Sequence, residues 1–160
     1  MAQKSNFVDM AVSIYFQGVK RPYFASNQRI SSWLHALAHQ YGRSIEELNI
    51  VFMFDDELLK INQQFLQHDY YTDIITFDNG TTEKMILGEL YISLDRVRDN
   101  AKTMSEKYQQ EFFRVIAHGL LHLIGFQDKN SEKIVEMRAC ESHAISLYLS
   151  MNSPLKENNI

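Results

Sequence analysis

The stretch "LNIVFMFDDELLKINQQFL", residues 48–66, decides the fold. Residues 48–54 form a continuous apolar run, which predicts a strand covered on both faces rather than a half-exposed one. The acidic residues that follow suit the positively polarised start of a helix, so residues 55–66 are predicted to be helical. A buried strand leading into a helix indicates a domain in which helices pack on a sheet.

Outward from this stretch, three more segments have the β-branched and aromatic composition of strands. They are residues 11–16, 72–78 and 85–94. The sequence "SIEE", residues 44–47, has the pattern of a capping box and predicts a single helical turn before the central strand. These segments together predict a mixed sheet of about four strands.

Further helices are predicted from caps and stop signals. Ser26 is expected to cap a helix that Gly42 ends, Ser105 to cap a long helix that Gly125 ends, and residues 95–104 and 130–149 to form two more. The fold class is therefore predicted to be α+β, with helices packed on the sheet. We expect one domain over residues 1–151 and a frayed tail over residues 152–160.

The composition of the 160 residues is that of one globular domain, with 45% hydrophobic and 22% charged residues. The net charge of -4 does not indicate a nucleic-acid partner, although a local basic groove is compatible with it. A single cysteine, Cys140, excludes an internal disulfide and suits a reducing compartment. Without an apolar span or a signal-peptide pattern, the protein is expected to be soluble and cytoplasmic.

Two histidines stand one helical turn apart in "HGLLHLIGFQD", residues 118–128. The i, i+4 spacing of His118 and His122 places both imidazoles on one helical face, where they can bind one metal ion. Gly125 lets the chain turn back, which brings Asp128 within reach as a third ligand. Such a set leaves a coordination position open, as catalytic zinc sites do. The alternative is a pair of ordinary core histidines.

Four blocks of sequence occur in an order that is typical of a known family. Residues 61–78 read "INQQFLQHDYYTDIITFD", residues 87–93 "LGELYIS", residues 118–128 "HGLLHLIGFQD" and residues 137–141 "MRACE". They resemble the motifs of the YbeY family, the bacterial rRNA maturation factors, over roughly residues 48–145. The resemblance implies a metal-dependent, single-strand-specific endoribonuclease that acts in ribosomal RNA processing and ribosome quality control. Its implied partners are rRNA and the ribosome or ribosomal proteins.

The chain departs from the family pattern at the site. Asp128 stands where the family usually has a histidine ligand, and a carboxylate also serves zinc. Gln127 takes the place of a family aspartate, and Leu66 that of a family arginine associated with function. We expect one divalent ion per chain, zinc before others, on His118, His122 and Asp128.

Other polar residues have both a functional and a structural interpretation. Arg114, one turn before His118, is predicted to bind a phosphate, and its alternative is an i, i+3 ion pair with Glu111. Asp73 and Thr76 either line the cleft beside the metal or hold a strand end. His68 either approaches the metal or RNA or is an ordinary surface histidine.

Three functions remain open at this point. The first is a metal-dependent endoribonuclease that attacks a phosphodiester with a metal-activated water and has no assignable general base. The second is a non-catalytic ribosome-assembly factor that binds RNA or ribosomal proteins, which the loss of the arginine at Leu66 favours. The third is a zinc peptidase-like hydrolase, which is disfavoured because Gly119 stands where a zinc protease has its glutamate.

Overall fold

The computed structural model describes residues 11–153, and in them a four-stranded mixed sheet forms the centre of the domain. The strand order is β1 (Val12–Phe16), β2 (Ser44–Met53), β4 (Met85–Ser93) and β3 (Ile74–Asp78). The first three run parallel, and β3 pairs antiparallel with β4 at the edge. The α+β class and the mixed sheet predicted from the sequence are confirmed.

The helical turn predicted for residues 44–47 is wrong, because these residues begin β2. Their backbone is paired along β4 in parallel, with Ser44 opposite Met85, and the Ser44 N–H donates to the Lys84 carbonyl at 2.9 Å. A capping box satisfies two local N–H groups, whereas the neighbouring strand offers partners to the whole segment. The tertiary pairing therefore overrides the local helix signal.

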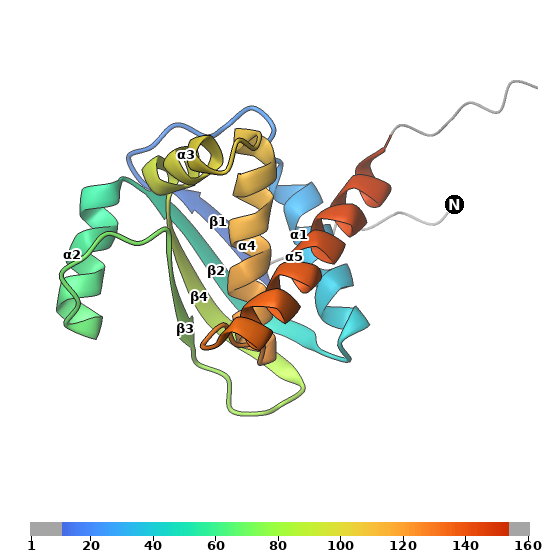
Figure 1. Ribbon diagram of the computed structural model, residues 1–160. Coiled ribbons are helices and arrows are strands. Elements are labelled where there is room, and N and C mark those ends of the chain that lie inside the picture. Colours follow the sequence, from blue (N-terminus) through green and yellow to red (C-terminus); the bar gives the residue numbers. More distant parts are fainter. Residues whose placement is uncertain (1–10, 154–160) are drawn as a thin grey trace, which may run out of the picture.

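The main core lies between one face of the sheet and three helices, α1 (Asn27–Gln40), α4 (Tyr108–Ile124) and α5 (Ser131–Asn152) (Figure 1). Trp33 of α1 is fully buried, and its indole N–H donates to the Ala144 carbonyl of α5 at 2.8 Å. Phe113 of α4 stacks on Tyr148 of α5 with ring centroids 4.0 Å apart. These contacts fix the positions of α4 and α5 relative to each other.

The opposite face of the sheet is covered by α2 (Asp55–Leu66), which stands apart from α4 and α5 in Figure 1. Its Leu58 packs in a smaller cluster with Met53 and Ile75. The start of α2 is bound to the start of α3 (Leu94–Thr103), because Arg96 donates to both carboxylate oxygens of Asp55. The prediction that α2 directly follows the central strand is confirmed.

The predicted cap at Ser105 is wrong, and the prediction that Gly125 ends the following helix is confirmed. Lys107 is the N-cap of α4, whereas Ser105 has φ 54° and donates its N–H to the Lys102 carbonyl, which closes α3. Helix α5 extends to Asn152, three residues beyond the prediction. The predicted tail lies mainly outside the described residues, as do residues 1–10. Between residues 11 and 153, no helix has the length and apolar character to cross a membrane.

Helix α4 lies unusually close to the sheet at two glycines. A Cβ placed on Gly119 of α4 would come within 2.7 Å of Ile74 Cδ1 and 2.8 Å of Leu90 Cδ2. A Cβ on Gly88 of β4 would come within 2.8 Å of the Phe77 carbonyl oxygen and 2.9 Å of Leu123 Cδ1 of α4. The close approach places the polar face of α4 directly beside the edge strand β3.

We expect Gly88→Ala to lower the free energy of unfolding by about 1–3 kcal/mol, because the added methyl group overpacks a backbone oxygen that cannot move freely. Urea denaturation measures this change. Gly80→Ala in the β3–β4 loop is the control, since its Cβ would meet the exposed Asp78 carboxylate at 3.1 Å and backbone atoms no closer than the Met85 carbonyl oxygen at 3.4 Å. Equal stability of the two variants would show that α4 does not need the glycine at position 88.

Candidate metal centre

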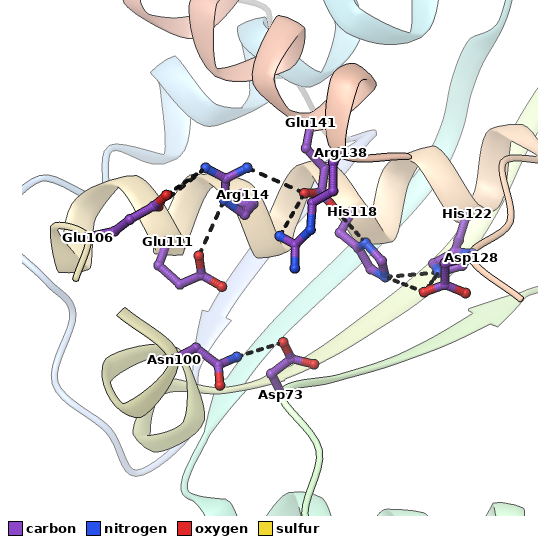
Figure 2. A network of polar contacts seen from close by, with 10 residues as sticks. All are labelled: Asp73, Asn100, Glu106, Glu111, Arg114, His118, His122, Asp128, Arg138 and Glu141. Carbon is purple, nitrogen blue, oxygen red and sulfur yellow. Dashed lines mark hydrogen bonds and ion pairs between the residues drawn. The ribbon is translucent and has the colours of Figure 1, made fainter. Parts of the chain in front are cut away.

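Three side chains converge at the end of α4 and form a possible metal site among the described residues. The Nε2 atoms of His118 and His122 are 2.9 Å apart, and Asp128 Oδ2 lies 3.5 Å from each of them (Figure 2). Donor atoms around a tetrahedral zinc ion with Zn–N bonds of 2.0–2.1 Å are about 3.3 Å apart. The geometry of the three side chains therefore fits one small divalent ion.

The turn after α4 brings Asp128 to the histidines. Gly125 ends the helix with φ 123°, a conformation that few L-residues adopt, and the Phe126 N–H donates back to the Leu121 carbonyl at 3.0 Å. Arg43 donates to the carbonyl of Ile124, the last residue of α4, at 3.1 Å. The chain thus reverses within a few residues, and Asp128 returns to the face that carries the histidines.

Contacts behind the two imidazoles fix which nitrogen of each ring faces the centre. His118 Nδ1 lies 2.7 Å from Glu141 Oε1, and His122 Nδ1 lies 3.0 Å from the Phe126 carbonyl. A carboxylate and a carbonyl accept hydrogen bonds, so each Nδ1 carries the hydrogen. In neutral rings both Nε2 lone pairs then point at each other and at a carboxylate. Only a cation makes that arrangement favourable, and the site therefore fits a metal ion.

The pKa of His118 is raised above its usual value. Burial lowers the pKa, but the hydrogen bond and the negative charge of Glu141, with the charges of Asp128 and Asp73, outweigh burial. Without an ion, a proton is the cation that the cluster of carboxylates favours. Protons and the metal therefore compete for the same position.

Glu141 belongs to a network of charges along α4 and α5 that is buried at Glu141, Glu111 and Arg114 and reaches the surface at Arg138 (Figure 2). Its Oε2 accepts from Arg138 at 3.3 Å and from Arg114 at 3.5 Å. Arg114 is 8% exposed and also pairs with Glu106 at 3.3 Å and Glu111 at 3.4 Å. The ion pair with Glu111, given as the alternative for Arg114, is thus present, and phosphate binding by Arg114 stays a prediction.

Two cavities meet at this centre. The smaller, of about 380 Å³, lies between α3, α4 and α5, and the larger, of about 550 Å³, lies between α4, β3 and the segment after α2. Asp73, His118 and Asp128 line both. The Asp73 carboxylate accepts from Asn100 at 3.0 Å, and Thr76 lines the larger cavity. Both residues therefore lie in the cleft beside the candidate metal ligands.

Some site residues had no assigned role at the level of sequence. Glu141 and Arg138 appeared only as letters of the "MRACE" block, and Asn100 had no signal at all. His68, for which a plain surface position was one interpretation, lines the larger cavity together with His118 and His122. A polar residue is recognised from sequence only where its partners stand at a fixed spacing, and here the partners come from other elements.

Comparison with known proteins gives the family. The family model described as endoribonuclease YbeY matches residues 17–148, which include all three candidate ligands. The chain belongs to the YbeY family. It is 48% identical to the endoribonuclease YbeY of Cytophaga hutchinsonii over 74% of this chain and 82% of that protein, and 43% identical to that of Phocaeicola vulgatus over 85% and 97%.

A solved structure supports the YbeY fold as well. The solution structure of TM1509 from Thermotoga maritima is similar with a TM-score of 0.60 and 26% identity, over 88% of this chain and 90% of that one. The resemblance that the sequence motifs indicated is confirmed.

We expect Glu141→Gln to weaken zinc binding about 10–100-fold, because the carboxylate that orients His118 and raises its basicity is lost. Competition with a chromophoric chelator measures the affinity. Glu136→Gln changes the same charge on the exposed side of α5 and should bind zinc like the wild type. Unchanged affinity in Glu141→Gln would mean that this contact does not support the metal.

Glu111 should make stability depend on pH. Burial raises its pKa from 4.5 to about 7, against the opposing charge of Arg114. Between those pH values the folded protein holds a proton that the unfolded chain has lost, so stability falls as pH rises, by up to about 3 kcal/mol. Glu111→Gln has no carboxyl group to lose a proton at this position. The melting temperature of the variant minus that of the wild type should therefore increase from pH 5 to pH 8.

Thermal melts of both proteins in the presence of a chelator test this, since metal loss then contributes to neither. The difference between the two melting temperatures cancels the titration of groups that the substitution leaves alone. A difference that stays constant over the pH range would contradict the raised pKa of Glu111.

Proposed function

We propose that this chain hydrolyses phosphodiester bonds of single-stranded RNA with one divalent ion, zinc, bound by His118, His122 and Asp128. The observation that carries the proposal is the pair of Nε2 atoms that face each other beside a carboxylate, each fixed by a contact at Nδ1. Membership of the family makes the chain an endoribonuclease, and the ligand set leaves room for water and substrate.

When bound, the ion supplies a water of lowered pKa and polarises a phosphoryl oxygen. The protein's own residues prepare that position. Glu141 and the Phe126 carbonyl hold the two rings in one tautomer, and Asp128 adds a negative charge that moderates the ion. No general base is assigned, and the carboxylate of Asp73, which lines both cavities, lies beside the reaction space.

Arg114 has a part in this proposal in one of two roles. It either contacts an RNA phosphate through the wall of the smaller cavity or orients Glu141 against His118. Three carboxylates lie within 3.3–3.5 Å of its guanidinium and compensate its charge, and Nη1 and Nη2 already donate to Glu141 and Glu106. That surrounding favours the orienting role over direct phosphate contact.

A peptidase function is disfavoured by packing as well as by sequence. The zinc-protease base would have to replace Gly119, and a Cβ at that position meets Ile74 and Leu90 at 2.7–2.9 Å. A side chain there would enter the core and not the metal centre. The centre therefore has no place for the glutamate base of a zinc protease at this position.

The finer biological assignment rests on the resemblance of the sequence blocks. We infer that the RNA is ribosomal, that the protein works with the ribosome or ribosomal proteins in the cytoplasm, and that its role is rRNA maturation and quality control. A purely structural assembly factor remains the second candidate, because Leu66 contributes no charge where the family has an arginine. Incubation of zinc-loaded protein with single-stranded RNA and with a peptide pool separates these functions.

Asp128→Ala should lower zinc affinity by at least about tenfold and abolish RNA cleavage, since only two ligands remain. Asp128→His should keep zinc and change the cleavage rate, because a neutral ligand leaves the ion a stronger Lewis acid. Zinc titration and cleavage of a labelled single-stranded RNA measure both effects, with His122→Ala as the variant that loses the ion.

Asp99→Ala, an exposed carboxylate on α3, is the matched control and should behave like the wild type. An effect of Asp128→Ala cannot come from the loss of a helix cap. The N-cap of α5 is Asn130, whose side chain accepts from the Lys133 N–H at 2.9 Å. Asp128→Ala protein with wild-type zinc affinity would remove Asp128 from the site.

A further inference from the structure

The larger cavity beside the metal centre has an unusual distribution of charge. Its lining carboxylates are Asp73, Asp78 and Asp128, and no lysine or arginine is among the described residues that line it. Leu66 lies in the wall and is uncharged. An RNA phosphate that enters this space meets three negative side chains, so favourable contacts have to come from the bound ion and from any other group able to carry positive charge.

His68 is that group. Apart from the two candidate metal ligands, it is the only described side chain lining this cavity that can take up a proton to become a cation. It lies in the segment between α2 and β3, across the cavity from α4. An imidazole N–H donor placed there can reach an anionic backbone that also contacts the metal centre.

The ring of His68 is held in one orientation. Its Nδ1 lies 2.9 Å from the Tyr70 hydroxyl, and the two rings stack with centroids 5.0 Å apart and an angle of 22°. The hydroxyl donates to Nδ1 of the neutral ring and accepts from Nδ1 of the protonated ring, and in both cases Nε2 carries a hydrogen. The contact with Tyr70 therefore makes Nε2 the donor.

The backbone that carries both rings is also fixed. Asn62 of α2 is 1% exposed, and its side-chain amide donates to the Tyr70 carbonyl at 2.8 Å. The backbone carbonyl of Asn62 accepts from the backbone N–H of His68 at 3.2 Å. Gln67, which directly precedes His68, takes a left-handed conformation with φ 55°. A buried amide used to hold an exposed segment indicates that the position of the segment matters.

We propose that His68 binds an RNA backbone phosphate beside the scissile one, with Tyr70 as the residue that positions it. The inference rests on the proposed function, because it takes RNA as the ligand of this cavity. It assigns the strand a path, from the metal centre along the cavity wall formed by β3 to the segment after α2. His68 has a binding role in this assignment and takes no part in bond cleavage.

The test compares wild type, His68→Ala, His68→Lys and Tyr70→Phe, all as zinc-loaded full chains. The probe is a fluorescein-labelled single-stranded RNA, and both its binding by anisotropy and its cleavage are measured. We expect His68→Ala to weaken binding about tenfold, the loss of one charge-assisted hydrogen bond. Its KM should rise by the same factor while kcat changes little.

His68→Lys restores a cation and should recover part of the affinity. Tyr70→Phe keeps the stacked ring but frees the imidazole, so its loss should be smaller than that of His68→Ala. His39→Ala replaces an exposed histidine on α1 outside the cavity and should bind like the wild type. Zinc content should be the same in all variants.

Equal RNA affinity in wild type and His68→Ala would overturn the assignment of His68. Loss of zinc from His68→Ala would overturn it as well, since the effect on RNA then comes from the metal centre. Wild-type protein that binds the RNA but does not cleave it would refute the proposed function alone, and the anisotropy series would still decide on His68. Wild-type protein that neither binds nor cleaves RNA would refute both.

Discussion

The contact between Glu141 and His118 is the interaction on which the site depends. A carboxylate that is 2% exposed is costly to bury unless its charge is compensated, and Glu141 is compensated by Arg114, Arg138 and His118 together. The same contact joins α5 to α4 and fixes the tautomer of His118. Loss of the carboxylate would leave Arg114 and Arg138 with fewer partners and the imidazole free to turn. The contact that packs α5 against α4 is thus the same contact that sets the state of His118 at the centre.

Much of the fold follows from local sequence, and the exceptions have long-range causes. The continuous apolar run after Leu48 and the acidic start of α2 predict their elements because burial and the helix dipole act within a few residues. Ser44 and the residues after it form a strand instead of a turn because β4 lies beside them, which no local pattern reveals. Ser105 looks like a cap, but the closing turn of α3 takes its N–H.

In the candidate site, too, some residues are predictable from local sequence and others depend on long-range packing. His118, His122 and Asp128 come from one stretch of chain, where helical spacing and one glycine are enough to predict that they meet. The residues behind them come from α3, α5 and the segment before β3, and their approach depends on how α4 packs against the sheet. Gly88 and Gly119 allow that approach, and sequence alone gives them no such meaning.

On the proposed function, the charges around the centre would couple metal binding to RNA binding. Four carboxylates face two arginines in the smaller cavity, and the larger cavity has carboxylates with no lysine or arginine among the described residues that line it, so the centre without an ion would disfavour a phosphodiester. A divalent ion on the proposed ligands His118, His122 and Asp128 would supply positive charge at the point where the cavities meet. RNA should accordingly bind more tightly to the metal-loaded protein than to the metal-free protein. By linkage, bound RNA should hold the ion more tightly by the same factor. On the proposed function, a cleft rich in carboxylates would thus favour an anionic strand only with the ion in place.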